Sequence, residues 1–318
     1  MPVYVNTNYS ALQGQRYLGN VQNSLTTTYQ RLSSGMRINS AKDDAAGLQI
    51  ADRLTSQING LNQGNRNASD GIALAQTAES GMDEISGMLQ KIRTLAVQAA
   101  NGTNSAEDKA ALSKEASALA NEITRIAKQT TFAGKTILNG KQKNSIDPDA
   151  GGAGGVGGGN AGKAQDITLQ VGSNKGDTIG FKLENMQFSV IGSRADGTFK
   201  ATYTGQDKII GIAGSVITFK FSDGKASPSD AIVLMDKMIA QVDAQRADLG
   251  ALQNRLESSI RNQSNVAANE ADARSRIRDA DFAEESANLS QQSIIQQAAA
   301  SMLMQANTRP QLGLSLLG

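Results

Sequence analysis

The residue types that perform most enzymatic chemistry are absent from this chain. Its 318 residues include no histidine, no cysteine and no tryptophan. Without cysteine there is no thiolate nucleophile and no disulfide, and without histidine there is no imidazole base or imidazole metal ligand. Acid–base chemistry would have to depend on carboxylates, lysine or tyrosine. The composition therefore predicts neither an enzyme nor a bound cofactor.

Two pairs of adjacent carboxylates, Asp43-Asp44 and Glu284-Glu285, are the residue type that general acid–base catalysis requires. Catalytic carboxylates need a cleft and surroundings that separate their pKa values. Both pairs stand where helices are expected to begin, and acidic residues there complement the helix dipole. We interpret both pairs as structural.

The glycine-rich tract 151–162 imitates nucleotide-binding motifs. It fits the spacing of the dinucleotide fingerprint and, with Lys163, most of the P-loop pattern. Both motifs require a preceding strand and a following helix whose N-terminus meets the phosphate. Ala164 stands where the magnesium-binding hydroxyl would be needed. The tract is better explained as a flexible linker.

Charge and hydropathy limit the partners of the chain. Lysine and arginine total 31 and aspartate and glutamate total 30, whereas nucleic-acid binding favours a basic excess. No apolar run is long enough to span a membrane, and the N-terminus shows no secretory signal pattern. We expect no nucleic-acid binding and no membrane insertion.

Apolar residues spaced alternately by three and four predict a long helix over 43–100. The pattern slips by one residue after Met82 and resumes at Ile85, as in a heptad repeat with a stammer. A capping signal at Ser105 predicts a second helix, and 131–140 has the pattern of a short hairpin.

A serine, a proline and an aspartate within 227–230 predict the start of another long helix. Its expected buried positions are Met235, Met238, Val242, Leu249, Leu252, Leu256, Val266, Ala273 and Ile277, with Gln245, Ser259, Gln263 and Glu270 among them. So polar a face suits helices that also pack against neighbouring molecules.

The two chain ends carry further helical stripes and opposite charges. Residues 1–40 hold three arginines and no acid, whereas 279–318 hold four acids and one arginine. The formal charges of these two segments are thus +3 and −3. We expect the ends to pair, within a molecule or between molecules, through Arg31 and Arg37.

The middle segment, 141–227, differs in its pattern. Alternating apolar residues predict strands at 167–171, 179–183, 199–203 and 217–221. The expected fold is therefore mainly α, a long antiparallel helical bundle or coiled coil from both chain ends, with a small β-rich domain inserted in the middle.

Long motifs near both ends resemble bacterial flagellin. They are QRLSSGMRINSAKDDAAGLQIA at 30–51, NRNASDGI at 65–72, LQKIRTLAVQ at 89–98 and RDADFAEE at 278–285. The resemblance covers about 1–140 and 228–318. It implies a structural subunit that self-assembles into the extracellular flagellar filament after export, unfolded, by the flagellar type III apparatus.

The resemblance also implies the role of each segment. Residues 1–42 and 273–318 would be terminal helices forming the inner filament core. Residues 43–140 and 228–272 would form a helical rod with its hairpin, and 141–227 the exposed variable domain with its glycine-rich linker. Inner-core assembly would use Leu18, Val21, Leu25, Leu32, Phe282, Leu289, Ile295, Met302 and Leu303.

The partners implied by the resemblance are other copies of the chain, an export chaperone at the C-terminal helix, the filament cap, hook-associated proteins and a host Toll-like receptor. Receptor and protofilament contacts would be Gln90, Lys91, Leu95 and Glu115. Lys91 stands where many receptor-active flagellins have arginine, whose planar bidentate contacts lysine cannot make.

Two other functions remain open at this point. A hook–filament junction protein would share the terminal helices but match these motifs less closely. A secreted, adhesin-like binding module would act through the β insert.

Overall fold

The computed structural model describes residues 7–142, 144–147, 164–197, 199, 204, 208–213, 216–221 and 227–315, with side chains as far as residue 308. The chain divides into two compact units. The terminal unit comprises Met1–Asn59 and Asn265–Gly318, and the central unit comprises Gly60–Ser264. Two long helices contribute to both units, because the division falls inside them.

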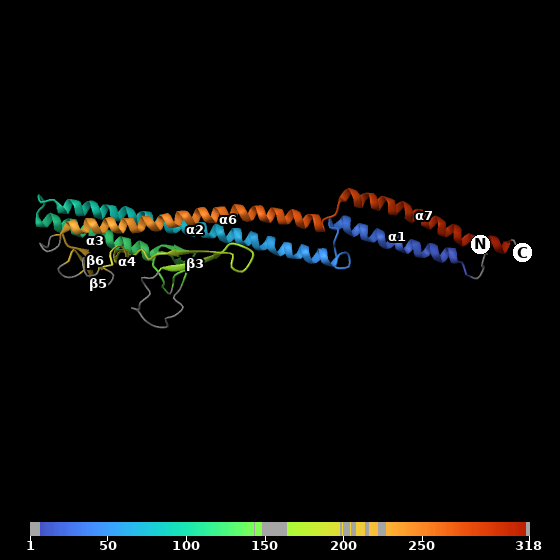
Figure 1. Ribbon diagram of the computed structural model, residues 1–318, viewed down its shortest axis with the longest axis horizontal. Helices are drawn as coiled ribbons and strands as arrows, with labels where there is room; N and C mark the ends of the chain where they lie inside the picture. The colour runs from blue at the N-terminus through green and yellow to red at the C-terminus, as the bar shows by residue number, and fades with distance from the viewer. Residues whose placement is uncertain are drawn as a thin grey trace. The chain divides into compact units, whose positions relative to one another are not determined.

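The terminal unit is built on an antiparallel pair of helices, α1 (Tyr9–Ser34) and α7 (Phe282–Ser315), which lie side by side in Figure 1. The Asn8 side chain accepts a hydrogen bond from Ala11 N and caps the start of α1. Gly35 ends it with a φ of 70°, the left-handed conformation that glycine adopts at low cost.

A short antiparallel ladder joins the segment after α1 to the segment before α7. Arg37 N donates to Arg278 O at 2.7 Å, and Ala280 N donates to Gly35 O at 3.0 Å. Beyond the ladder, Asp44 Oδ1 accepts from Gly47 N at 2.8 Å and caps the helix that follows. The first acidic pair of the sequence therefore includes a helix cap.

That helix is α2 (Ala45–Ala100), and α6 (Pro228–Arg278) runs antiparallel to it in the central unit. The three- and four-residue spacing expected over 43–100 is confirmed by burial at Ala51, Ile58, Leu61, Ala68, Ala75, Met82, Ile85, Leu89, Ile92, Ala96 and Ala99. Met82 and Ile85 are both fully buried, as the slipped pattern predicts, and Ser86, which an unbroken pattern would bury, is also buried.

The stripe of α6 is confirmed as far as Leu256 and then differs from the expectation. Val266 is exposed, and Ala267 is buried in its place. Positions 266 and 267 lie three and four residues beyond the buried Gln263 and so share its face of the helix, and the second of them is the one that is buried. Ala273 is also exposed, so two of the expected positions on α6 are wrong.

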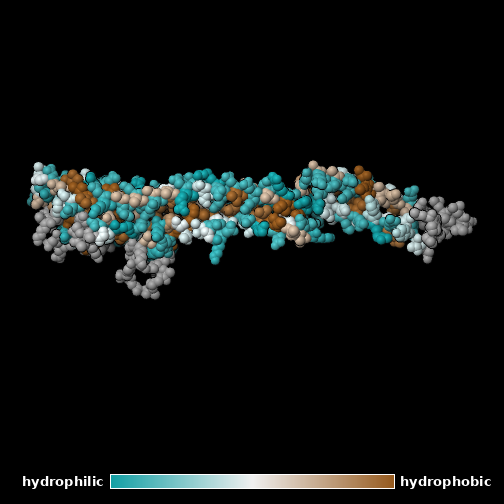
Figure 2. Space-filling model, in the orientation of Figure 1, coloured by the Kyte–Doolittle hydropathy of each residue, from teal (hydrophilic) through white to brown (hydrophobic). Residues whose placement is uncertain are grey.

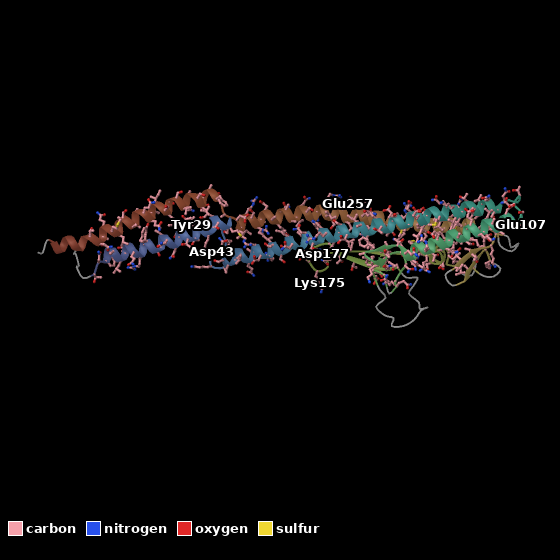
Figure 3. The ribbon with its side chains drawn as sticks, turned by 180° about the vertical axis from the view of Figure 1, so that it is seen from behind. Tyr29, Asp43, Glu107, Lys175, Asp177 and Glu257 are labelled. Carbon is pink, nitrogen blue, oxygen red and sulfur yellow. The ribbon has the colours of Figure 1, made fainter. Side chains whose placement is uncertain are left out.

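The next helix, α3 (Ala106–Gln129), begins at the capping box that the sequence predicts. Ser105 Oγ accepts from Asp108 N at 3.1 Å, while Asp108 Oδ2 accepts from Ser105 N at 3.0 Å. The Ser105 side chain is also the leading cause that lowers the pKa of Asp108. Glu107, labelled in Figure 3, adds a second acid to this first turn.

The expected hairpin after α3 consists of β1 (Thr131–Phe132) and β2 (Lys135–Thr136). Ala133 and Gly134 form its turn with φ values of 49° and 78°. Two successive left-handed residues give the tight turn that matches the twist of a two-stranded ribbon. The hairpin is therefore confirmed.

Two antiparallel ribbons and a helix make up the described part of the insert. β3 (Gln165–Gln170) pairs with β4 (Thr178–Leu183), and β5 (Ile210–Ala213) pairs with β6 (Val216–Phe219). The strands expected near 167, 179 and 217 are thus confirmed. Along the chain, α4 (Phe188–Ala195) follows β4 and precedes β5.

The strand expected at 199–203 is wrong at Phe199, which is helical, and 200–203 lie outside the described residues. α4 was not expected either, because eight residues are too few for a helical period to stand out from strand alternation. The glycine-rich tract 151–162 also lies outside the described residues.

The β3–β4 ribbon packs on α2 at three glycines. A Cβ at Gly60 would meet Ser173, one at Gly64 would overlap the carbonyl oxygen of Val171, and one at Gly71 would overlap the Leu169 side chain. Glycine inside a helix is unfavourable by about 1 kcal/mol relative to alanine. Close approach of the ribbon to the helix backbone explains why these positions are glycine.

The edge of β6 is bound by α3. Ser113 Oγ accepts from Phe221 N at 2.9 Å, Ser117 Oγ accepts from Phe219 N at 2.7 Å, and Asn121 Oδ1 accepts from Ile217 N at 2.9 Å. Helix positions four apart therefore meet strand positions two apart. This polar ladder covers a strand edge that would otherwise be open to pairing.

One hydrophobic core joins the insert to the helices of the central unit. It contains residues of α2, α3 and α6 together with residues of both ribbons and α4, including Phe188 and Phe219. These two rings meet edge to face with centroids 5.8 Å apart. Phe188, Ile191 and Leu183 are fully buried. The insert therefore shares its core with the rod.

Within the described residues, no helix combines the length and apolar character needed to cross a membrane. The same part of the chain holds no cluster of three carboxylates, the only ligand set that a chain without histidine and cysteine could offer from these residue types.

Candidate assembly site

The residues expected to build an inner assembly core lie on α1 and α7 of the terminal unit. Val21 and Leu25 are buried. Leu18, Leu32, Leu289, Ile295 and Leu303 are half-buried. Phe282 and Met302 are 58% and 71% exposed. The isolated chain thus covers only part of this set.

Large apolar side chains at the surface are concentrated in the terminal unit. Among the described side chains, those of the terminal unit that remain more than a third exposed are Tyr9, Leu12, Tyr17, Tyr29, Ile50, Val266, Phe282, Ile294, Met302 and Met304. Figure 2 shows brown apolar patches among hydrophilic residues over α1 and α7. Exposed apolar side chains gathered on one pair of helices are the kind of surface at which proteins associate.

The core of the terminal unit is correspondingly small. Among its described side chains, the buried apolar ones are Val21, Leu25, Ile38, Ala51, Ile58, Ala267 and Ala299, whereas the continuous core cluster lies wholly in the central unit. Two helices with few buried side chains gain little stability from packing. Burial against other molecules would supply what the unit lacks.

An ion pair connects the two helices of the terminal unit. Arg31 Nη1 lies 3.0 Å from Glu285 Oε1, and the Glu285 side chain is only 9% exposed. The expected pairing of the two chain ends is thus confirmed within one molecule at Arg31. Arg37 instead donates from Nη2 to the carbonyl oxygen of Ile277 at 2.8 Å.

The adjacent acids have structural partners, as expected. Asp43 Oδ2 accepts hydrogen bonds from the backbone of Ser40 at 2.9 Å and of Asn39 at 3.1 Å. The backbone bond from Ser40 is the main reason that the pKa of Asp43 is below its ordinary value. Glu285 serves the ion pair with Arg31. Neither pair forms an acid–base site.

The four residues expected to contact a receptor all belong to the central unit. Gln90 and Lys91 are exposed on α2, and Glu115 is exposed on α3. Leu95 is half-buried against the hydrophobic core. The three polar side chains are therefore accessible, while the leucine is largely committed to internal packing.

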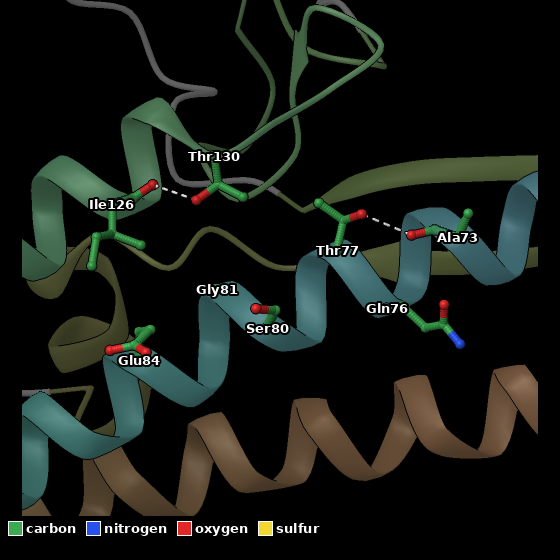
Figure 4. A pocket seen from close by; sticks show the side chains of 8 residues that line it. All are labelled: Ala73, Gln76, Thr77, Ser80, Gly81, Glu84, Ile126 and Thr130. Atoms are coloured by element: carbon green, nitrogen blue, oxygen red, sulfur yellow. Dashed lines mark hydrogen bonds between the residues drawn. The ribbon is translucent and has the colours of Figure 1, made fainter.

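An open groove of about 650 Å³ lies between α2 and the end of α3 (Figure 4). Two of its hydroxyl groups bond to their own helices, since Thr77 donates to Ala73 O and Thr130 donates to Ile126 O, both at 2.8 Å. Among the described residues that line it, Glu84 is the only ionisable one. A single carboxylate with no second ionisable side chain beside it makes no acid–base pair.

Sequence reasoning missed the polar residues that fix the insert to the β1–β2 segment. Gln165 is fully buried, and its Nε2 donates to Ile137 O at 3.1 Å and to Gly140 O at 3.0 Å. Asn185, also fully buried, donates to Asn139 O at 3.2 Å. Gln165 occupies an apolar-facing strand position, and that mismatch with the alternation is the signal that could have identified it.

A second fixation is ionic. Lys141 Nζ lies 2.8 Å from Asp147 Oδ2 and 3.2 Å from Asp166 Oδ2. The hydrogen bond to Asp147 is the main cause that raises the pKa of Lys141, and the same bond lowers the pKa of Asp147. The cluster holds 147 beside 166 and so fixes the base of the insert.

The fold and this surface define a class of protein: a helical structural protein with a well-packed central unit and a thin terminal pair of helices that exposes apolar side chains for association. Comparisons with known proteins identify the family. The bacterial flagellin N-terminal helical region matches residues 5–143, and the bacterial flagellin C-terminal helical region matches residues 232–317.

Similar proteins agree with this assignment over the full chain. The chain is 37% identical to flagellin D of Vibrio anguillarum and 38% identical to flagellin A of Vibrio cholerae, in each case covering all of both chains. A solved structure from Vibrio parahaemolyticus, provisionally assigned as a flagellar hook-associated protein, shares the fold with a TM-score of 0.53. It is 13% identical and is matched over 74% of this chain and all of that one.

The chain belongs to the bacterial flagellin family. It is a structural subunit of the flagellar filament, polymerising with copies of itself. The hook–filament junction and adhesin alternatives are not favoured, because the full-length relatives are flagellins.

Proposed function

We propose that the helices of the terminal unit form the inner core of the filament, with 1–42 and 273–318 as the core segments, 43–140 and 228–272 as the surrounding rod, and 141–227 exposed. The observation that carries the proposal is the contrast between the two units. The central unit buries a continuous core, whereas the terminal unit exposes most of the large apolar side chains at the surface.

The first test removes apolar area without removing a helix. Ile294→Ser and Met302→Ser change side chains of α7 that are 67% and 71% exposed. Burying such a side chain contributes about 1.5–3 kcal/mol, so each change should suppress filament growth while helical content stays near wild type. Val233→Ser is the matched control, since Val233 is 49% exposed on α6 of the central unit.

Electron microscopy after seeding, with sedimentation of the polymer, measures the result. A truncation that lacks 279–318 should also fail to polymerise while the central unit keeps its cooperative unfolding. Normal filaments from the truncated chain, or from both α7 variants, would contradict the inner-core assignment.

We propose the extracellular filament as the location of the assembled chain, reached by export through the flagellar type III apparatus and with growth under a filament cap next to hook-associated proteins. Family membership supports this. An export chaperone would cover α7 beforehand, because Ile294, Met302 and Met304 are exposed on one helix. Titration calorimetry of this chain with the purified export chaperone of the same bacterium tests this. An affinity that is unchanged when residues 279–318 are removed from this chain would refute it.

The rod is proposed to contact a Toll-like receptor, and neighbouring protofilaments, through Gln90, Lys91, Leu95 and Glu115. Exposure of the three polar side chains supports this. Lys91→Arg should strengthen the response of receptor reporter cells, because arginine makes planar, bidentate hydrogen bonds. No response to either the wild-type monomer or the variant would remove the proposal.

A further inference from the structure

Three Asn–Gly pairs occur in the chain, at Asn59-Gly60, Asn101-Gly102 and Asn139-Gly140. Asn–Gly is the dipeptide most prone to spontaneous deamidation, because glycine has no side chain to shield its nitrogen. The nitrogen of the glycine must reach the carboxamide carbon of the asparagine. A fold that restrains either group slows the reaction. Because the three dipeptides are identical, differences in their rates of deamidation should come from the structure around them.

The pair Asn101-Gly102 is unrestrained. Both residues are exposed in the turn that joins α2 to α3, and nothing lies within 4 Å of the position a Cβ would take on Gly102. In the part of the chain that the structure describes, neither the Asn101 carboxamide nor the Gly102 N–H has a hydrogen-bond partner. Both reacting groups are therefore free.

The other two pairs are held. Asn59 and Gly60 lie inside α2, where the glycine N–H is part of the helix, and Ser173 packs directly on Gly60. Asn139 is fixed on both sides: its Oδ1 accepts from Gln187 Nε2 and its carbonyl oxygen accepts from Asn185 Nδ2. Gly140 is buried next to it.

The geometry points to Asn101 as a site of spontaneous, age-dependent covalent modification in the folded protein. The Gly102 nitrogen attacks the Asn101 carboxamide carbon, forming a C–N bond that closes a five-membered succinimide while ammonia leaves. Water then opens the ring at either carbonyl, giving aspartate or isoaspartate. One water is consumed and one ammonia is released overall, and no oxidant or cofactor takes part.

The modification adds one negative charge between two helix ends. It lies directly after the last residue of α2, where the helix dipole disfavours an anion, and four residues before the capping serine of α3, where the dipole favours one. The fraction of subunits that carry this charge would rise with the time since synthesis. This goes beyond the structural role of the filament subunit.

Peptide mapping of the full-length protein tests the inference. Trypsin places each pair in a separate peptide, namely 54–66, 94–109 and 136–141. Native protein is kept at mildly alkaline pH, and aliquots are digested from time zero onward. Mass spectrometry should show the acid forms accumulating in 94–109 while the other two peptides keep their amides.

Two controls separate structure from sequence. In protein unfolded by urea, all three peptides should convert at similar rates. Gly102→Ala should slow conversion several-fold without changing helical content, because the space around Gly102 is open and its φ is not in the left-handed region. Conversion of 54–66 or 136–141 as fast as 94–109 in native protein, or no slowing by Gly102→Ala, would overturn the inference.

Discussion

Reversing the charge of Arg31 tests directly whether the pairing of α1 with α7 controls assembly. Arg31→Glu would place two carboxylates together at a site where Glu285 is only 9% exposed. It would also remove the basic residue from the last turn of α1. Arg31→Met is the milder companion, since it removes the ion pair and keeps an unbranched apolar stem.

The magnitude follows from the burial of the two partners. A hydrogen bond between charged groups contributes about 1.5–3 kcal/mol, and the 31% exposure of Arg31 argues for the lower end of that range. Arg31→Met should therefore cost about 1.5 kcal/mol of the stability of the terminal unit. Arg31→Glu should cost more, about 2–4 kcal/mol, because repulsion between the two carboxylates is added.

The assay is the critical concentration for polymerisation, measured by sedimentation at fixed salt. A change of about 1.4 kcal/mol corresponds to a tenfold shift, so Arg31→Met should raise the critical concentration about tenfold and Arg31→Glu further. The double variant Arg31→Glu with Glu285→Arg should recover part of the loss. Recovery is incomplete because each charge then opposes the dipole of its own helix by about 0.3–1 kcal/mol.

Two results would refute this reasoning. One is an unchanged critical concentration in Arg31→Glu, which would mean that the ion pair is irrelevant to the assembled state. The other is a double variant no better than the single one, since the loss would then come from something other than the pairing with Glu285.

Three further predictions concern the central unit. Gly64→Ala should lower the free energy of unfolding by about 1–3 kcal/mol, measured by urea denaturation, because its Cβ overlaps the ribbon backbone. Gly87→Ala, with open space around it, should instead raise the free energy of unfolding by about 0.5–1 kcal/mol; equal effects would contradict the packing argument. Ser105→Ala should lower the free energy of unfolding by about 1 kcal/mol, measured by thermal unfolding, and an unchanged stability would argue against the cap. The pKa of Asp147 is lowered and that of Lys141 raised. The ion pair therefore stabilises the folded state fully at any pH between the ordinary pKa values of the two groups. This stabilisation is lost as pH falls through the folded pKa of Asp147 or rises through that of Lys141. Protection factors for amide hydrogen exchange at 164–170 that do not change across the acid range would refute this.

The sequence predicts most of the helical fold because burial on one face imposes a period that can be recognised residue by residue. The slip after Met82 could be located because Met82 and Ile85 are both apolar and both buried. The prediction failed where residue type and position disagree, as at Val266, which is exposed although apolar. α4 was missed because its eight residues hold too few turns to establish a period.

The surface was predictable where charge alone suggested a partner and not where shape was decisive. Opposite charges on the two chain ends were enough to expect that the ends pair, but not to identify Glu285 as the partner of Arg31. The glycines of α2 gave no such signal, because an exposed helix glycine and one covered by a ribbon look the same in sequence. Likewise, the ladder from Ser113 to Asn121 depends on a strand about 100 residues distant.

The contact of the β3–β4 ribbon with Gly60, Gly64 and Gly71 has a consequence for how such chains diverge and can be recombined. These three positions of α2 are glycine because this ribbon packs on them, so the sequence of the helix and that of the insert depend on each other. A chimera with a different insert keeps three glycines inside α2, which are unfavourable in a helix, but loses the ribbon that packs on them. Exchange of the insert should succeed only when these three positions of α2 are exchanged with it.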